Sequence, residues 1–415
     1  MNPVNNAALI RRELMMRLAR LTFRGELEEK IDRIPLEMFP RSRASIRCCI
    51  HKDRAVIRYR LMALLGFGIE AEEDELTTLA EYARTALTRH RAEPEVLTVL
   101  DEACSACVQS RYFVTNACRG CMARPCTLNC PKDAIRMVQG RAEIDTEKCV
   151  NCGICVKVCP YHAVVRMPIP CEEACPVDAI TKDECGKERI DHEKCIQCGK
   201  CQQACPFGAV MEKSSLVQVA ALLKRKEPLA ALVAPAVAGQ FDPDPRKVYG
   251  ARKALGFSVV AEAAAGADRT VCREAEEWQE HAAAGETLLA SSCCPAWTRA
   301  AERHLSPGIV HLSTAPSPMR ETAALVREAW PEHRTVFIGP CTAKRQEALA
   351  DPAIDLVLTF EELGALFVAA GVDVKESPAA TADIAGSAAG RGFPVSGGVT
   401  KALAQQLGEG FRPTM

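Results

Sequence analysis

Cysteine content is the feature that most constrains how this chain can fold. The sequence has 23 cysteines in 415 residues, and most of them lie between Cys104 and Cys205. In a small secreted domain such a density indicates disulfides, but in a chain of this length with no leader-like start it indicates thiols that bind metal. We therefore expect the middle of the chain to fold around metal centres.

Two runs of cysteines share one spacing, C-x2-C-x2-C-x3-C-P. The runs are Cys149, Cys152, Cys155 and Cys159, and then Cys195, Cys198, Cys201 and Cys205. Two-residue spacers let three thiolates surround one 4Fe-4S cubane, while the fourth cysteine, before proline, reaches a neighbouring cluster. Zinc ribbons also use C-x2-C pairs, but not four cysteines in this order. The spacing predicts ferredoxin-like 4Fe-4S binding.

The runs belong to an internal repeat. Residues 129–164 align with residues 174–210, which indicates that one supersecondary unit has been duplicated. Crossed ligation within and between units predicts three clusters. The predicted ligand sets are Cys118, Cys121, Cys126 and Cys159; Cys130, Cys149, Cys152 and Cys155; and Cys175, Cys195, Cys198 and Cys201.

Cys171 and Cys205 belong to none of these three ligand sets. Cys104 and Cys107 lie upstream with the missing C-x2-C spacing, and we expect these four cysteines to bind a fourth cluster. The alternative is that all four are reduced structural thiols. We expect Cys185 to be a turn residue. The Cys48-Cys49 pair is expected to consist of core thiols rather than ligands.

The chain is predicted to be an α+β multidomain protein. Apolar residues have helical spacing in segments 7–21 and 72–87, which predicts a helical region over residues 1–100. A duplicated 4Fe-4S ferredoxin domain is expected over 101–213. Strand-like and helix-like segments alternate over 214–415, which predicts an α/β domain with a mainly parallel sheet.

Charge and hydropathy exclude several classes of partner. Lys and Arg number 52 and Asp and Glu 53, so the net charge of -1 gives no electrostatic reason to expect nucleic acid or an anionic membrane as partner. No stretch approaches 18 apolar residues, and the amino terminus has no apolar core before a cleavage site. We expect a cytoplasmic protein.

Two further cysteine motifs carry a resemblance to a known family. SSCCPAW (291–297) and GPCTAKRQE (339–347) each follow a predicted strand, where α/β proteins place ligands. Both resemble signature motifs of the iron-only (FeFe) hydrogenases, and with the ferredoxin repeats the chain is similar to the monomeric group-B-like branch. The resemblance implies reversible reduction of protons to H2. It also implies ferredoxin or a similar carrier, and hydrogenase maturation proteins, as partners.

The resemblance implies an active centre, the H-cluster, in which a cysteine joins a 4Fe-4S cubane to a two-iron unit. By motif, Cys294 and Cys341 would ligate the cubane, Cys293 would pass a proton to the two-iron unit, and Lys344 would hold a cyanide ligand. The further matches are Glu274, Glu277, Ser313 and Ser317 in the proton relay, and Ala234, Pro235 and Phe393 in the pocket wall. Without the family, the two glutamates would be a solvated helix flank.

The chain also departs from the family pattern. Gly339, Met319 and Ala236 stand where Met, Gln and Ser are common. The third motif, which supplies the other two cubane ligands, is missing, since no cysteine follows Cys341. We therefore expect a carboxyl-terminally incomplete hydrogenase, inactive as it stands. The alternative is a non-catalytic hydrogenase-like polyferredoxin that transfers electrons or senses redox state or H2.

Overall fold

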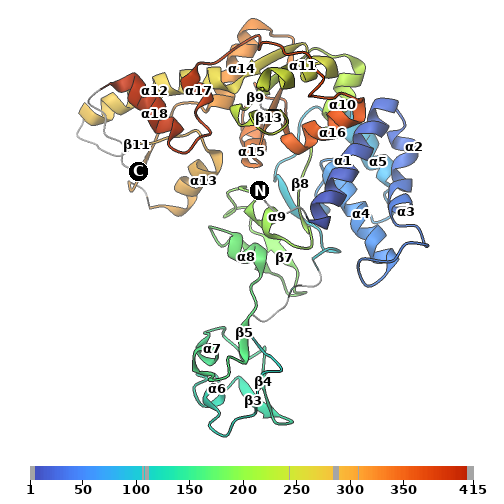
Figure 1. The fold of residues 1–415 in the computed structure, drawn as a ribbon, viewed down its shortest axis with the longest axis vertical. Helices are drawn as coiled ribbons and strands as arrows, with labels where there is room; N and C mark the ends of the chain where they lie inside the picture. The colour runs from blue at the N-terminus through green and yellow to red at the C-terminus, as the bar shows by residue number, and fades with distance from the viewer. Residues whose placement is uncertain are drawn as a thin grey trace.

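The computed structural model describes residues 5–104, 107, 112–242, 244–283, 289–306 and 308–408. Figure 1 shows a helical region in blue, two small lobes in cyan to green, and an α/β domain in yellow to red. The predicted α+β multidomain class is confirmed. Among the described residues, no helix combines the length and the apolar character that a bilayer span requires.

The amino-terminal region is helical, as predicted. Its elements are α1 (Asn6–Arg24), α2 (Leu27–Lys30), η1 (Ile31–Arg33), α3 (Ile34–Met38), α4 (Ile50–Leu64), η2 (Ile69–Ala71) and α5 (Leu79–Thr88). Asn5 caps α1 by accepting a hydrogen bond from the Ala8 N–H. The helix predicted over 72–87 is wrong in its first half. Thr78 and Glu81 form a capping box that starts α5 at Leu79, and residues 72–78 are not helical.

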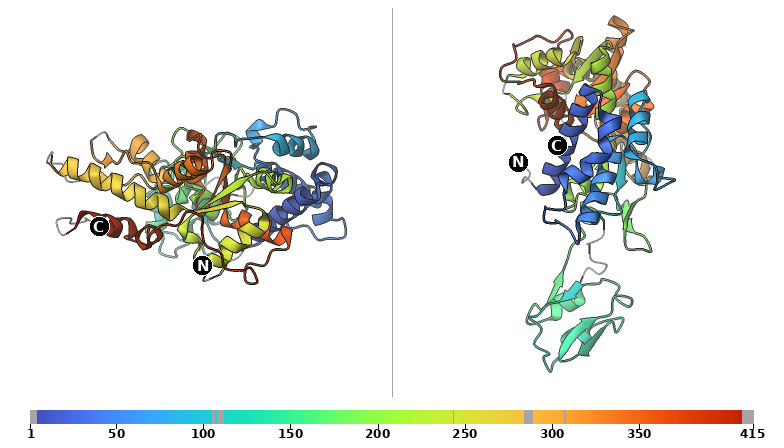
Figure 2. Two further views of the ribbon diagram at one scale, coloured as in Figure 1. Left: turned by 90° about the horizontal axis from the view of Figure 1, so that it is seen from above. Right: turned by 90° about the vertical axis from the view of Figure 1, so that its right-hand side faces the viewer.

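The two lobes have the same architecture, which explains the sequence repeat. The distal lobe contains β2 (Tyr112–Val114), α6 (Pro125–Leu128), β3 (Ile135–Val138), β4 (Arg141–Ile144), α7 (Ile154–Val158) and β5 (Val164–Arg166). The proximal lobe contains β1 (Leu97–Val99), α8 (Pro170–Ala174), β6 (Ile180–Lys182), β7 (Glu188–Ile190), α9 (Lys200–Ala204) and β8 (Val210–Glu212). Antiparallel pairs β2–β5 and β3–β4 in one lobe correspond to β1–β8 and β6–β7 in the other. The distal lobe is therefore an insertion between β1 and the rest of the proximal lobe, and Figure 2 shows that it projects away from the remainder of the molecule.

The α/β domain is built on a four-stranded parallel sheet in the order β10-β9-β13-β14, as the alternation of elements predicted. The strands are β9 (Leu229–Val233), β10 (Val259–Glu262), β13 (Arg334–Gly339) and β14 (Leu356–Thr359). The helices and the short η3 are α10 (Leu216–Arg225), η3 (Pro235–Val237), α11 (Pro245–Leu255), α12 (Ala263–Ala283), α13 (Pro295–His304), α14 (Pro318–Ala329), α15 (Ala343–Ala350), α16 (Phe360–Ala370), α17 (Ala388–Arg391) and α18 (Gly398–Leu407). The predicted strand before Cys293 forms outside this sheet, because β11 (Leu289–Ala290) pairs with β12 (His311–Leu312).

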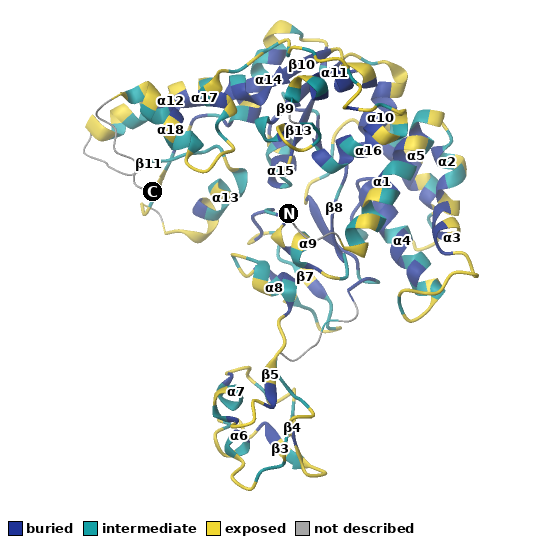
Figure 3. Cartoon of the chain, in the orientation of Figure 1, coloured by how far each residue is buried: buried dark blue, intermediate teal, exposed yellow. Residues whose placement is uncertain are grey.

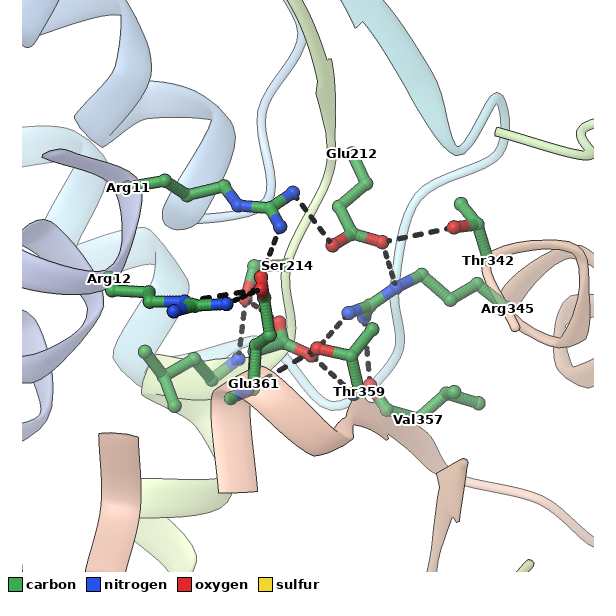
Figure 4. A network of polar contacts seen from close by, with 11 residues as sticks. Arg11, Arg12, Glu212, Ser214, Thr342, Arg345, Val357, Thr359 and Glu361 are labelled. Carbon is green, nitrogen blue, oxygen red and sulfur yellow. Dashed lines mark hydrogen bonds and ion pairs between the residues drawn. The ribbon is translucent and has the colours of Figure 1, made fainter. Parts of the chain in front are cut away.

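A buried network of charges joins the three regions (Figure 4). Arg345 of α15 contacts Glu362 of α16, and its Nε lies 3.4 Å from Glu212 Oε2 at the end of β8. Glu212 also lies 3.8 Å from Arg11 of α1. Burial lowers the pKa of Arg345, but the carboxylates of Glu362 and Glu212 outweigh burial, so the pKa is raised. The guanidinium therefore stays charged between two buried carboxylates.

The network gives a stability prediction. We expect Arg345→Ala to lower the free energy of unfolding of the α/β domain by about 3–5 kcal/mol, because two buried carboxylates lose their shared cation. The three tryptophans all lie in this domain, so denaturant unfolding followed by tryptophan fluorescence measures it. The matched control is Arg12→Ala, whose ion pair with Glu361 is exposed and should contribute about 1 kcal/mol or less. Equal losses in the two variants would contradict the prediction.

Candidate metal centres

The distal lobe brings thiols of the first two predicted sets together. Burial, and then Cys159 and Cys118, raise the pKa of Cys126. Cys130, Cys149, Cys152 and Cys155 line one cavity of this lobe. Burial raises the pKa of Cys155, and the thiols of Cys149 and Cys152 add to the rise. Cys121 is half-buried, and its place in the first set remains a prediction from spacing.

The third predicted set gathers in the proximal lobe. Burial raises the pKa of Cys201 to about 12, with contributions from Cys195, Cys198 and Cys175. The pKa of Cys195 is raised by burial and by Cys175 and Cys198. These four thiols lie close enough to disfavour one another's ionisation. Bound iron would relieve this repulsion, because metal-bound thiolates have given up their protons.

The proposed fourth set also gathers in the proximal lobe. Burial raises the pKa of Cys171, and Cys205 and Cys107 contribute to the rise. The pKa of Cys104 is likewise raised by burial, with Cys205 among its neighbours. The topology explains this grouping, because β1 leads to Cys104 in the proximal lobe as β2 leads to Cys118 in the distal lobe.

A backbone donor that the sequence analysis missed accompanies each Cys-Pro step. The alanine N–H four residues after the cysteine donates to its sulfur at Cys130, Cys159, Cys175 and Cys205, with N···S distances of 3.3, 3.4, 3.2 and 3.4 Å. The signal was present in the sequence as C-P-x-x-A in all four copies. Such bonds stabilise negative charge on sulfur and help to set the potential of a bound cluster.

Four cysteines that belong neither to these sets nor to the hydrogenase-type motifs are exposed, namely Cys48, Cys49, Cys185 and Cys272. Cys185 lies in a turn, where its N–H donates to Asp183 Oδ1 at 3.0 Å. The prediction that Cys48 and Cys49 are core thiols is wrong. Both are exposed, because they belong to the loop that leads into α4, with Cys49 as its N-cap residue. Hydrogen bonding to the Lys52 N–H is the largest of the effects that lower the pKa of Cys49.

The two hydrogenase-type motifs converge in the α/β domain. Cys294 precedes α13, and Cys341 lies between β13 and α15. Burial raises the pKa of Cys341, while Lys344 lowers it and Cys294 raises it further. Burial also raises the pKa of Cys293, which lies within electrostatic reach of Lys344 and Cys294. The structure therefore brings these residues together, with Cys294 exposed and Cys293 and Cys341 half-buried.

Lys344 is held by its own neighbours in this site. Its Nζ donates to Ser317 Oγ at 3.1 Å and to Glu347 Oε2 at 2.6 Å. Lys344 is buried, with 9% of its surface exposed. Its ammonium group is thus already positioned, although a cyanide ligand would have to share it with Glu347.

The relay glutamates lie on one side of α12, at different depths. Glu274 is buried and accepts hydrogen bonds from Ser291 Oγ at 2.7 Å and from the Ser292 N–H at 3.1 Å. Glu277 is half-buried and accepts from Ser313 Oγ at 2.6 Å. The loop that holds Glu274 is the one that presents Cys293, whose N–H donates to Ser291 Oγ at 3.3 Å.

The predicted wall residues are not all brought together. Ala234 and Pro235 follow β9, beside the loop that leads to Cys341. Phe393 lies between α17 and α18, which pack along α12. Glycine at 339, where Met is common in the family, has a structural reason. A Cβ at this position would lie 2.7 Å from the Phe337 ring and 3.2 Å from the Ala234 methyl. This chain therefore cannot accept a larger residue at 339 unless Phe337 moves.

Comparisons with known proteins agree with the resemblance. Residues 227–412 match the family model described as iron only hydrogenase large subunit, C-terminal domain, and residues 142–165 and 188–211 match the 4Fe-4S binding domain. Iron hydrogenase 1 of Clostridium pasteurianum is 31% identical over 307 residues, which are 66% of this chain and 52% of that protein. The nuclear prelamin A recognition factor of Homo sapiens is 29% identical over 155 residues, which are 32% of this chain and 34% of that protein.

Similarity to solved structures is partial. A structure of an FeFe hydrogenase from Chlamydomonas reinhardtii is 28% identical, with a TM-score of 0.35, over 39% of this chain and 48% of that one. The chain spans about half the length of the curated hydrogenase relatives that it matches. From the family models and sequence relatives, the chain is an FeFe-hydrogenase-like protein with 4Fe-4S clusters, and such relatives carry the H-cluster.

The fourth set gives a prediction about iron content. After anaerobic reconstitution of the full chain, Cys104→Ser/Cys107→Ser should bind about four fewer irons than wild type, the content of one cubane. Cys185→Ser is the matched control and should lose none, since Cys185 is an exposed turn residue. Colorimetric iron and sulfide analysis measures the difference. Unchanged iron in the double variant would mean that these four cysteines are structural thiols.

The burial of Glu274 gives a pH prediction. Burial raises the pKa of Glu274 above its usual 4.5, although bonds from Ser291 and Ser292 lower it. The folded protein therefore holds this proton more tightly than the unfolded chain. The stability that the carboxyl contributes is present below pH 4.5 and is lost as the pH rises through the folded-state pKa.

Wild type should consequently lose more stability than Glu274→Gln between pH 4.5 and neutrality. Tryptophan-detected denaturant unfolding at a series of pH values measures the difference. Glu276→Gln, on the exposed side of α12, is the control and should follow wild type. A constant difference between wild type and Glu274→Gln at all pH values would contradict the prediction.

Proposed function

We propose that this FeFe-hydrogenase-like chain conducts electrons through four 4Fe-4S clusters to and from a hydrogenase-type site, where protons and H2 interconvert when that site is complete. Its electron partner would be a ferredoxin or a similar redox carrier. Loading of the two-iron unit would require the family's maturation proteins. The observation that carries the proposal is the contact between the third cluster set and the Cys341 loop.

That contact is a close approach of backbone to side chain. Gly199 lies between Cys198 and Cys201 and has a φ of +74°. A Cβ added at this residue would lie 3.0 Å from Thr342 Oγ1. Thr342 directly follows Cys341. On the other side, Arg303 of α13 donates to the Cys195 carbonyl at 3.2 Å. The Cys341 loop and the helix that follows Cys294 therefore both contact the third set, which supports a route for electrons between them.

The distal lobe is suited to receive electrons from a carrier. It projects from the molecule, and apolar side chains near its first thiol set are exposed, with Met122 at 99% and Leu128 at 81%. Larger exposed apolar patches mark interaction sites, and we propose that these side chains belong to one. We therefore place the entry of electrons at this lobe.

The proton side uses groups that an electron carrier does not need. Glu277 is half-buried on α12, and Glu274 lies one turn away and is buried, bound to the Ser291 loop that presents Cys293. The raised pKa of Glu274 helps this carboxyl to hold a proton inside the domain. We propose the order Glu277, Glu274 and Cys293 for proton movement between surface and site.

The thiols present do not complete an H-cluster. The cubane needs four ligands, and Cys294 and Cys341 are two. The unassigned thiols are Cys48, Cys49, Cys185 and Cys272, all exposed and outside both motifs. Metal sites depend on ligands that the backbone already positions, so these thiols are poor substitutes. We therefore derive no catalytic step through the two-iron unit.

This ligand count favours a second candidate function. With the ferredoxin-type clusters alone, the chain would act as a hydrogenase-like electron-transfer protein or as a sensor of redox state or H2. The retention of Cys293, Lys344 and Glu274 in one place favours the hydrogenase site. The two functions differ in whether CO and cyanide ligands and H2 turnover can be detected.

We predict that the 415-residue chain, expressed with the maturation proteins, will reduce and reoxidise its clusters but evolve no hydrogen. Spectroelectrochemical titration should show about one electron for each 4Fe-4S cluster. Infrared spectroscopy tests for the two-iron unit directly, because CO and cyanide stretches fall where protein is transparent. Such bands together with H2 evolution would show that another group completes the site.

A further inference from the structure

We propose that Glu277, His281 and His311 form a site for one divalent transition-metal ion of the zinc type. One ligand atom from each side chain lies within 4.8 Å of the other two. Two imidazoles and one carboxylate are a ligand set that zinc uses, with positions left for water. This site is separate from the cysteine centres, and it does not depend on the proposed function.

The fold places the three side chains from two elements. Glu277 and His281 are four residues apart on α12, so they lie on the same face of the helix. His311 is the first residue of β12, and its ring centroid lies 3.9 Å from that of His281. Small side-chain rotations would bring the three ligand atoms to the separations of a tetrahedral ion, since metal–ligand bonds are about 2.0–2.2 Å.

The carboxylate is already oriented by a second layer of contacts. Glu277 Oε2 accepts from Ser313 Oγ at 2.6 Å, and Oε1 accepts from the Thr314 N–H at 2.9 Å. The Thr314 N–H also lies 3.1 Å from Oε2, so Oε1 is the oxygen that keeps a lone pair for a metal ion. Hydrogen bonds that fix a ligand in this way typically raise metal affinity 10- to 100-fold.

The surroundings suit a small cation that arrives from solvent. His311 is exposed, and Glu277 and His281 are half-buried, so an ion has a path of entry. A bound ion would join the last turns of α12 to β12, the strand that pairs with β11 ahead of Cys293. If the proposed proton route is correct, the same ion would also occupy the carboxylate of Glu277. That consequence rests on the proposed function, whereas binding does not.

The test is zinc binding by the full chain with its clusters in place. Five exposed thiols outside the four cluster sets could themselves take zinc, so every protein carries serine at Cys48, Cys49, Cys185, Cys272 and Cys294. Anaerobic isothermal titration with ZnCl2 should show one tight site. That site should weaken at least 100-fold in His281→Ala/His311→Ala, which removes two of three ligands. Glu277→Gln should weaken it to an intermediate degree.

The matched control is His90→Ala/His162→Ala, which removes two exposed histidines from other regions. It should bind zinc as the parent does. Far-ultraviolet circular dichroism and tryptophan fluorescence establish that each variant is folded. Equal zinc affinity and stoichiometry in the parent and in His281→Ala/His311→Ala would overturn the proposal. So would anomalous diffraction at the zinc edge that locates the ion elsewhere, and titration with Fe²⁺ in parallel distinguishes a zinc site from an iron site.

Discussion

The ion pairs of Arg345 with Glu212 and Glu362 are the constraint on which the arrangement of the molecule depends. Arg345 follows Cys341 by four residues, and Glu212 ends β8, the strand that closes the proximal lobe. Glu362 lies in the first turn of α16, which packs against α1. A buried charge without its partner is costly, so the three regions must come together for any one of these charges to be satisfied. These ion pairs hold the proximal lobe beside α15, the helix that follows the Cys341 loop.

Local patterns in the sequence were sufficient for most of the fold. Cysteine spacing predicted which thiols would gather, because the spacer lengths and the proline determine where each sulfur can point. Alternating strands and helices predicted the parallel sheet. The strand β10 was not anticipated, although Val259–Glu262 is completely buried, because a short apolar run between two helices has no periodicity of its own.

Other features depend on contacts that a linear pattern does not contain. β1 and β2 are equivalent strands of the two lobes. This equivalence is visible only in the structure, where Leu97–Val99 pairs with β8, more than 100 residues later. It gives Cys104 and Cys107 a structural reason to join the last repeat. The exposure of Cys48 and Cys49 could not be inferred from composition either, since cysteine is commonly buried and only the path of the loop before α4 places them in solvent.

The two lobes depend on iron to different degrees, although their C-x2-C-x2-C-x3-C-P runs have the same spacing. In the distal lobe the buried apolar residues form two small groups, Cys126 with Ile135 and Ala142, and Cys159 with Ala163 and Val164. In the proximal lobe, Cys171, Cys195 and Cys201 belong to the main core of the molecule. Figure 3 shows the distal lobe mostly in the colours of intermediate and exposed residues. A unit with so few buried apolar residues needs bound metal to stabilise its fold. Cluster binding therefore supplies much of the folding free energy of the distal lobe. The proximal lobe is supported by its neighbours, and its thiols can be positioned before iron arrives. The duplication has thus produced one lobe that projects from the molecule and one that is fixed against the α/β domain.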